Sequence, residues 1–192
     1  MFSDIKEYAK QNDVPITKDD TMQFIVDYIN TNKIKSILEI GTAIAYGSIN
    51  MAMCDSVDML DTVEISAENY NQAVLNIEKY GLRQKINTHF INAKQYIDNC
   101  DKKYDMIYLD GPKGQYANYL PRLLQLLNGG GTIIADNIFF HGMVTGEIPT
   151  PSSCRSMVNG LRQYIDMVTH DKSLEAHIYQ IGDGVCVTKL KD

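Results

Sequence analysis

The sequence predicts an α/β protein with a doubly wound, mostly parallel sheet of seven strands that closes with a C-terminal antiparallel hairpin. Two observations predict this class. Short apolar runs alternate along the chain with segments whose apolar residues recur at helical spacing, which is the pattern of strand–helix units in a parallel sheet. The last two strand-like runs are separated only by Gly182-Asp183-Gly184, a sequence typical of a hairpin turn.

Strands are expected where short apolar runs end in a polar or turn-forming residue. These runs cover residues 36–41, 59–64, 86–91, 104–109, 132–135, 176–181 and 185–189. The triplet Gly129-Gly130-Gly131 is interpreted as a turn leading into the fifth strand. Residues 92–95 follow the third strand, and no helix is assigned to them.

Helices are expected where apolar side chains recur every three or four residues, as Met22, Ile25 and Ile29 do within residues 18–30. Gly81 is expected to end the helix over residues 68–80. The other expected helices cover residues 4–12, 51–53 with their neighbours, 116–127 and about 153–168. Residues 1–31 thus form an N-terminal helical extension of one domain that spans residues 1–192.

Bulk composition limits the classes of protein to consider. A chain of 192 residues is long enough for one domain with a substantial core. No apolar run approaches the roughly 20 residues that span a bilayer, and the N-terminus has no apolar signal core. Four scattered cysteines predict neither a disulfide framework nor a zinc site, so a reducing cytoplasm is the expected location. The net charge of -6 argues against a surface that is basic as a whole.

The first group of candidate functional residues surrounds the first two expected strands. Gly41 and Gly47 follow the first strand, where glycine lets a ligand approach the backbone closely. Glu64 ends the second strand about 20 residues later, the distance at which an acid accepts hydrogen bonds from ribose hydroxyls. Because no G-x-G-x-x-G motif for a pyrophosphate is present, the pattern favours a cofactor with ribose but no phosphate, such as S-adenosylmethionine. The alternative is an ordinary turn with a surface Glu64.

The second group lies at the ends of the fourth and fifth strands. Asp110, Asp136 and Asn137 are oxygen donors that would meet at one edge of the sheet, and such donors suit Mg²⁺. Lys113 follows Asp110 after a Gly-Pro turn and is the candidate general base. The alternatives are that Asp110 caps the helix beginning near residue 115 and that Asp136-Asn137 is only a turn.

Other polar residues are weaker candidates. The four histidines, His89, His141, His170 and His177, lack mutual metal-ligand spacing, although His141 follows Asp136-Asn137 on the expected substrate loop. Arg155, Arg162 and Lys172 could form a basic face, but a solvated helix face is the simpler interpretation.

Several of these segments resemble the metal-dependent class I O-methyltransferases, the family of catechol and caffeoyl-CoA O-methyltransferases. The likeness runs from about Val14 to the C-terminus. It rests on residues 37–46 (ILEIGTAIAY), Val63-Glu64, Asp110-Gly111-Pro112-Lys113, Asp136-Asn137 and Ile181-Gly182-Asp183-Gly184. The resemblance implies a Rossmann-like methyltransferase fold, Mg²⁺ held by Asp110, Asp136 and Asn137, Lys113 as the base, and ribose bound by Glu64.

The same resemblance implies the rest of the cofactor site. Thr17, Gly41 and Thr42 would lie near the methionine part of S-adenosylmethionine, and Lys94 and Gln95 near the adenine. The full expected cofactor-binding set is Thr17, Glu39, Gly41, Thr42, Tyr46, Gly47, Ser48, Glu64, Ile65, Lys94, Gln95 and Asp110.

The chain departs from the family pattern at two places near this site. The family usually has Gly-Tyr-Ser where this chain has Ala45-Tyr46-Gly47, so the serine that binds the cofactor carboxylate is displaced to Ser48. The acid common after the third strand is absent, because Ala93-Lys94 stands where Asp-Ala is usual. Neither departure touches the expected metal ligands.

Within the family, residues 113–116 and 136–144 are similar to the bacterial tRNA 5-hydroxyuridine methyltransferases. This likeness implies methylation of 5-hydroxyuridine at the tRNA wobble position in the anticodon, giving 5-methoxyuridine. A small catechol-like hydroxylated aromatic is the alternative acceptor, and the acidic net charge favours it. A non-catalytic nucleoside-binding protein is a further alternative. Family analogy also implies a homodimer, and no membrane partner is expected.

Overall fold

The computed structural model describes residues 2–191. The chain forms two compact units, one ending at Tyr96 and the other beginning at Ile97. Within the described residues, the predicted α/β class is confirmed: seven strands occur, five alternate with helices, and the C-terminal strands are antiparallel. Residues 1 and 192 of the predicted single domain lie outside the described residues, and the single domain itself stays a prediction.

The first unit is built on three parallel strands in the order β3-β2-β1. They are β1 (Ser36–Ile40), β2 (Met59–Glu64) and β3 (Ile86–Phe90). Ile40 is paired with Val63, so β1 and β2 end at the same edge. Ligands of such sheets bind beyond the carboxyl ends of the strands, and the residues after β1 and β2 therefore define the place to look for a site.

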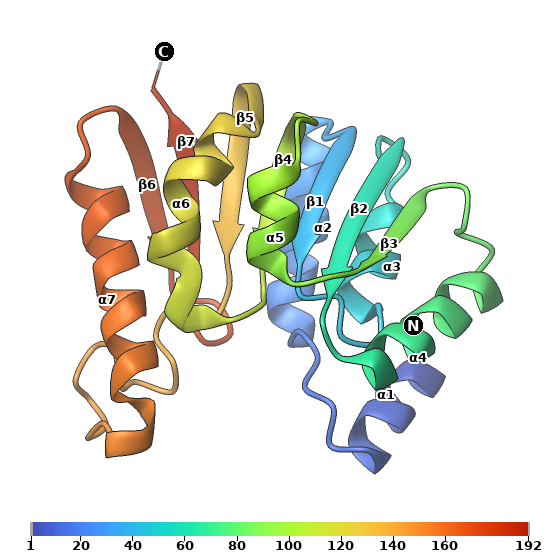
Figure 1. The fold of residues 1–192 in the computed structure, drawn as a ribbon, viewed down its shortest axis with the longest axis horizontal. Helices are drawn as coiled ribbons and strands as arrows, with labels where there is room; N and C mark the ends of the chain where they lie inside the picture. The colour runs from blue at the N-terminus through green and yellow to red at the C-terminus, as the bar shows by residue number, and fades with distance from the viewer. Residues whose placement is uncertain (1, 192) are drawn as a thin grey trace. The chain divides into compact units, whose positions relative to one another are not determined.

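Four helices belong wholly to the first unit: α1 (Ser3–Gln11), α2 (Asp19–Asn32), α3 (Tyr46–Ala52) and α4 (Ala67–Lys79) (Figure 1). The predicted apolar stripe of α2 is buried, with Ile25 and Ile29 fully inaccessible. A fifth helix, α5 (Ala93–Asn99), starts in this unit, where the sequence predicted none. The side chain of Asn92 accepts a hydrogen bond from the Lys94 amide at 2.9 Å, and this local cap starts the helix despite its weak apolar pattern.

The N-terminal helix α1 is joined to the first unit by two polar contacts. Asp4 accepts hydrogen bonds from Lys79 at 2.5 Å and from the Tyr80 hydroxyl at 2.6 Å, at the end of α4. Lys6 contacts Asp19 at 2.6 Å, at the start of α2. The first helix of the predicted extension is therefore fastened to the start of α2 and to the end of α4.

The second unit contains four strands in the order β4-β5-β7-β6. β4 (Tyr104–Leu109) is parallel to β5 (Leu127–Ala135), and β7 (Val185–Leu190) is antiparallel to both β5 and β6 (Leu174–Tyr179). The expected turn at Gly129-Gly130-Gly131 is wrong, because β5 already begins at Leu127. Leu127 is paired with Tyr104 and Thr132 with Met106, so the glycines form an irregularity inside the strand, where Gly130 has φ = 76°.

The helices of the second unit are α6 (Tyr116–Gln125) and α7 (Arg155–His170). α6 ends before residue 127, where its prediction ended, because β5 takes over the chain there. Two short 3₁₀ turns precede these helices, Lys113–Gln115 before α6 and Ser152–Cys154 before α7.

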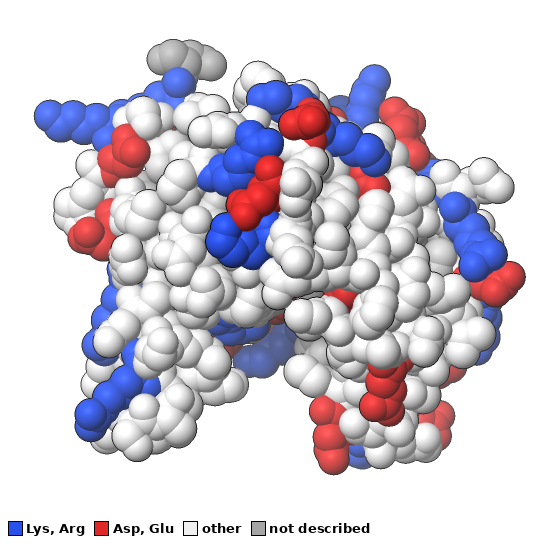
Figure 2. All heavy atoms as spheres, in the orientation of Figure 1, with Lys and Arg blue, Asp and Glu red and all other residues white. Residues whose placement is uncertain are grey.

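No helix within residues 2–191 is long and apolar enough to cross a membrane. The four cysteines are free. On the face drawn in Figure 2, Lys and Arg side chains are interspersed with Asp and Glu, and large neutral areas separate them.

Candidate active site

The loop after β1 is fixed by the end of β2. The amides of Gly41 and Thr42 both donate to the carbonyl oxygen of Val63, at 3.1 and 3.2 Å. Gly41 has φ = 105°, a conformation that glycine adopts without steric cost. The chain therefore turns away from the sheet directly beside Glu64, as the predicted cofactor loop requires.

The carboxylate of Glu64 organises this loop. One oxygen accepts a hydrogen bond from the Ala43 amide at 2.8 Å, and the other accepts from the amides of Ile65 and Ser66 at 2.8 and 2.7 Å. Hydrogen bonds from three backbone donors to a carboxylate are charge-assisted and keep it oriented. Glu64 thus lies at the strand end predicted for a ribose-binding acid and joins the two segments that a nucleoside would contact.

Beneath the loop lies a second acid, Glu39, which is buried in β1. One of its oxygens accepts hydrogen bonds from the hydroxyls of Ser48 and, at 2.6 Å, Thr62. Because the Thr62 proton is used in this way, the hydroxyl of Thr42 donates to Thr62 at 2.6 Å. The hydroxyls of Ser48 and Thr42, both predicted to bind cofactor, are therefore directed into the protein in this structure.

Gly47 explains why this chain has no serine at the usual family position. A Cβ atom on residue 47 would lie 2.6 Å from a carboxylate oxygen of Glu39. Any side chain there would have to displace the buried acid. Glu39 therefore accounts for both features of this loop: it leaves no room for a side chain at residue 47, and it accepts a hydrogen bond from the hydroxyl of Ser48.

The remaining predicted cofactor residues surround these acids in the first unit. Ile65 is 64% exposed beside Glu64, an arrangement that offers an apolar surface to a flat ring. Lys94 and Gln95 are exposed on the first turn of α5, and Thr17 is buried just before α2. An exposed apolar surface beside an oriented acid fits the nucleoside part of S-adenosylmethionine.

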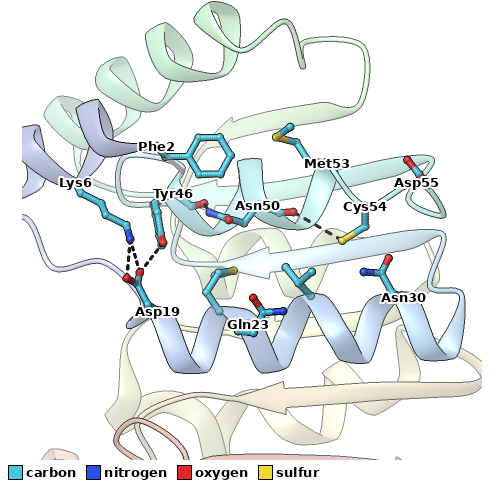
Figure 3. A pocket seen from close by; sticks show the side chains of 12 residues that line it. Phe2, Lys6, Asp19, Gln23, Asn30, Tyr46, Asn50, Met53, Cys54 and Asp55 are labelled. Atoms are coloured by element: carbon cyan, nitrogen blue, oxygen red, sulfur yellow. Dashed lines mark hydrogen bonds and ion pairs between the residues drawn. The ribbon is translucent and has the colours of Figure 1, made fainter.

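Tyr46 faces away from this set. Its ring lines a cavity of about 570 Å³ between α1, α2 and α3, and its hydroxyl donates to Asp19 at 2.9 Å (Figure 3). Figure 3 also shows Lys6 converging on the same carboxylate. Because no other predicted cofactor residue lines this cavity, it is separate from the predicted site. Tyr46 anchors α1 and α2 to the helix that begins at the cofactor loop.

In the second unit, Asp110 follows β4 and Asp136 follows β5. The register pairs Leu109 with Ala135, and the Asp136 amide donates to the Leu109 carbonyl at 3.0 Å. The two acids are thus brought to one edge, as predicted. The Asp136 carboxylate accepts hydrogen bonds from the Asn137 amide at 2.6 Å and from the buried Tyr108 hydroxyl at 3.1 Å.

These two contacts do not offset the burial of Asp136. Burial, together with the negative charge of Asp110, raises the pKa of Asp136 from 3.8 to about 7. The same two acids, after burial itself, raise the pKa of the buried Tyr116 hydroxyl. The edge therefore holds more negative charge than its own protein contacts neutralise.

Such an edge fits a divalent cation by its donor chemistry. Asp110, Asp136 and Asn137 offer carboxylate and amide oxygens, which suit Mg²⁺ and not zinc. Within residues 2–191 no group of three or more His, Cys, Asp or Glu side chains could hold a metal ion, and the set here contains only two acids. The third member, Asn137, is held at φ = 55°, a left-handed conformation that asparagine tolerates better than most residues.

Lys113 lies next to the predicted metal ligands. Its ammonium nitrogen is 3.3 Å from Asp110, and both side chains are about four-fifths buried. The 3₁₀ turn that carries Lys113 packs backbone to backbone on α7: a Cβ on Gly160 would lie 2.5 Å from the Gly114 carbonyl oxygen. The predicted base is therefore positioned by a contact that only glycine at residue 160 allows.

Sequence reasoning missed several residues that shape the site. Thr62 and Tyr108 point their hydroxyls at Glu39 and Asp136, but this depends on strand register, which the sequence did not reveal. Arg162 is exposed on α7, as predicted for a solvated helix face, but its guanidinium group also has a role that the sequence did not indicate. It donates hydrogen bonds to the carbonyls of Met143 and Val144, both at 3.0 Å.

Comparison with known proteins agrees with the geometry. The model of the O-methyltransferase family matches residues 3–191. Caffeoyl-CoA O-methyltransferase 2 of Petunia hybrida is 30% identical over 90% of this chain and 75% of its own length. The crystal structure of a putative caffeoyl-CoA O-methyltransferase from Staphylococcus aureus has a TM-score of 0.90 and 30% identity, covering 97% of this chain and 90% of its own. The O-methyltransferase TomG from Streptomyces achromogenes, solved with SAM, shares the fold with a TM-score of 0.83 at 21% identity, covering 96% of this chain and 86% of its own.

Proposed function

The chain belongs to the O-methyltransferase family, and from this premise we propose that it transfers a methyl group from S-adenosylmethionine to a hydroxyl oxygen with the help of Mg²⁺. One observation carries the metal-dependent part of the proposal. Burial of Asp136, together with the negative charge of the neighbouring Asp110, raises the pKa of Asp136 to about 7 at the strand edge where both acids lie. A divalent cation is the group that such oxygen donors would bind.

In the first unit, the residues would bind and orient the nucleoside. Glu64 would accept hydrogen bonds from the ribose hydroxyls, while the hydrogen bonds from three backbone amides keep its carboxylate in place. Ile65 contributes an apolar surface, and Lys94 and Gln95 flank the adenine. The SAM-bound TomG structure, which has the same fold, is consistent with this assignment.

In the second unit, Asp110, Asp136 and Asn137 would hold Mg²⁺. Bound there, the ion supplies a positive charge that acidifies and fixes the reacting hydroxyl. With its amine in the neutral form, Lys113 would accept the proton of that hydroxyl at Nζ, and the 3₁₀ turn packed on α7 holds this nitrogen near Asp110. Tyr108 keeps Asp136 oriented through its hydroxyl. Positioning and charge stabilisation supply most of the expected acceleration.

The acceptor that we propose is 5-hydroxyuridine at the tRNA wobble position. Its hydroxyl lies next to a carbonyl oxygen, so the two atoms can share one cation. The support is the likeness of residues 113–116 and 136–144 to tRNA-modifying relatives. The protein would act as a cytoplasmic homodimer.

A catechol-like aromatic is the second candidate acceptor, and two observations favour it. The relatives found by comparison carry the name caffeoyl-CoA O-methyltransferase, and the net charge of -6 does not favour a polyanion. A catechol also presents two neighbouring oxygens, so the proposed chemistry is the same.

The deciding experiment incubates the purified protein with methyl-labelled S-adenosylmethionine, Mg²⁺ and either tRNA or caffeoyl-CoA. The tRNA comes from a deletion strain of the organism that encodes this chain. Label in 5-methoxyuridine, abolished by a chelator, is the expected result. Label only in the aromatic acceptor would transfer the proposal to the second candidate. A protein that binds no S-adenosylmethionine in calorimetry would support the non-catalytic alternative.

A further inference from the structure

The loop between β5 and α7, residues 136–151, is held in a conformation that its own sequence does not favour. Asn137, Phe140 and His141 have positive φ values of 55°, 45° and 55°. Residues other than glycine adopt this left-handed conformation rarely and at a cost in free energy. Contacts with the rest of the second unit must therefore fix the loop.

The turn between β6 and β7 supplies the first of these contacts. The carbonyl oxygens of Gly184 and Asp183 accept hydrogen bonds from the amides of Ile138 and Phe139, both at 3.0 Å. The ring of Phe139 lies so close to Gly184 that a Cβ there would be 2.5 Å from a ring carbon. In Figure 1 this turn lies at the end of the unit toward which the arrow of β5 points. The hairpin turn predicted from the sequence thus also serves as a platform for the loop.

The side chain of Asp183 makes a further contact that a hairpin turn does not need. Its carboxylate is only 11% exposed, and both oxygens accept from the His141 amide, at 2.9 and 3.0 Å. A charge-assisted bond of this kind is stronger than one between neutral groups. The imidazole of His141, with Nδ1 3.7 Å from the carboxylate, remains 70% exposed. Asp183 therefore fixes the backbone of His141 and leaves its ring accessible.

Arg162 holds the second half of the loop. Its Nε and Nη2 atoms donate to the carbonyls of Val144 and Met143, both at 3.0 Å. The guanidinium group presents two donors in one plane, which a lysine ammonium does not reproduce. The loop is therefore hydrogen-bonded to Asp183 on the β6–β7 turn and to Arg162 on α7.

We propose that Asp183 is a positioning residue for acceptor binding. By fixing residues 137–144, with Arg162 as the second point of attachment, it keeps Asn137 and the exposed His141 in one arrangement before the acceptor arrives. This inference rests on the proposed function, since it assigns the loop to the acceptor and metal side of the site. A loop held in its binding conformation loses less entropy when a ligand binds.

The first test measures the loop itself. Amide hydrogen exchange of the full-length protein is compared among wild type, Asp183→Ala and Asp183→Asn, which keeps one acceptor oxygen. We expect exchange of the peptide spanning residues 137–148 to rise about tenfold or more in Asp183→Ala and less in Asp183→Asn. Asp171→Ala is the matched control, because that carboxylate also accepts a backbone amide, Ser173 at 2.8 Å, at the opposite end of α7.

The second test measures binding. Mn²⁺, as a probe for the metal, is titrated by electron paramagnetic resonance, and S-adenosylmethionine is titrated by calorimetry. Asp183→Ala should weaken Mn²⁺ binding about tenfold and raise KM for tRNA or caffeoyl-CoA, whichever wild type methylates, more than it lowers kcat. The affinity for S-adenosylmethionine should stay within about twofold. Arg162→Ala should change the same quantities in the same direction, and Arg162→Lys should restore little.

Exchange in residues 137–148 that is unchanged in Asp183→Ala would overturn the proposal, as would an equal rise in every peptide. If Asp183→Ala does not fold, the same criteria apply to Asp183→Asn and Arg162→Ala. A wild-type protein that binds no Mn²⁺ and methylates neither acceptor would refute the proposed function. The exchange measurement would still decide whether Asp183 holds the loop.

Discussion

The two units treat their acidic residues in different ways. In the first unit, the carboxylate of Glu64 accepts three backbone hydrogen bonds, which involve both of its oxygens. In the second unit, the carboxylate of Asp136 accepts one hydrogen bond from an amide and one from a hydroxyl. Burial beside Asp110 still raises the pKa of Asp136 to about 7. Neutral backbone donors thus hold Glu64 in the first unit, whereas a bound cation would favour the charged form of Asp136 in the second.

This difference shows which contacts identify a ligand. Acids that are saturated by internal donors are oriented and can accept hydrogen bonds from a neutral partner such as ribose. Acids that stay under-compensated indicate a partner with positive charge. The proposed function assigns the nucleoside to the first unit and the metal ion to the second on this electrostatic difference.

The largest expected effect is the loss of activity when either Asp110 or Asp136 is replaced by a neutral residue. Asp110→Asn or Asp136→Asn should lower kcat/KM for methyl transfer about 1000-fold, because the metal site loses a charged ligand. Radiolabel transfer from S-adenosylmethionine measures this change. S-adenosylmethionine affinity within about threefold of wild type is the control for Asp136→Asn, and full activity in either variant would contradict the metal mechanism.

A smaller effect is expected for Glu64, and it should concern binding of S-adenosylmethionine instead of binding of the metal. Glu64→Gln should weaken S-adenosylmethionine binding by about 10- to 100-fold, since hydrogen bonds to a charged group contribute about 1.5 to 3 kcal/mol. Calorimetry gives this constant directly. Mn²⁺ affinity should stay unchanged, and a comparable loss of Mn²⁺ binding would mean that the contrast between the units is wrong.

Stability without metal should depend on pH through Asp136. Its pKa is higher in the folded protein than the 3.8 of an unperturbed acid, so the folded state binds the proton more tightly. The free energy of unfolding should therefore decrease as the pH rises from about 4 to about 7. We expect a decrease of about 2 kcal/mol, with an upper limit of about 4 kcal/mol. Urea unfolding with a chelator at pH 5 and pH 8 measures this fall.

Two comparisons sharpen that measurement. In Asp136→Asn the part of the pH dependence due to residue 136 should disappear. Adding Mg²⁺ should stabilise the wild-type protein more at pH 8 than at pH 5. An identical pH dependence in wild type and Asp136→Asn would show that Asp136 ionises normally.

The smallest expected effect tests the hydroxyl of Ser48. Because this group bonds to the buried Glu39, Ser48→Ala should lower the free energy of unfolding by about 1 to 2 kcal/mol. S-adenosylmethionine affinity should change less than about threefold. A loss of affinity above tenfold, with stability unchanged, would restore Ser48 as a direct cofactor ligand.

The fold class and the positions of the acids could be predicted because they depend on local pattern. Apolar runs determined six of the seven strands to within about two residues, and the acids after β2, β4 and β5 follow directly from the strand ends. The exception was β5. Its glycines have no strand pattern, and they occupy an irregularity between the pairs Tyr104–Leu127 and Met106–Thr132 that the sequence does not indicate.

The partners of those acids could not be predicted. Tyr108 reaches Asp136, and Thr62 reaches Glu39, only through the register between neighbouring strands. Arg162 and Asp183 reach the loop after β5 from elements far along the chain. Such contacts depend on tertiary packing, and no spacing in the sequence indicates them.

The backbone contact between Gly114 and Gly160 has a consequence for unfolding. Because the two glycines leave no room for a side chain between them, the turn that carries Lys113 cannot detach without opening a gap against α7. The turn and the helix should therefore exchange and melt as one cooperative unit. At denaturant concentrations that loosen α7, the protein should lose the position of Lys113, its proposed base, while the Glu64 loop of the first unit keeps its backbone hydrogen bonds.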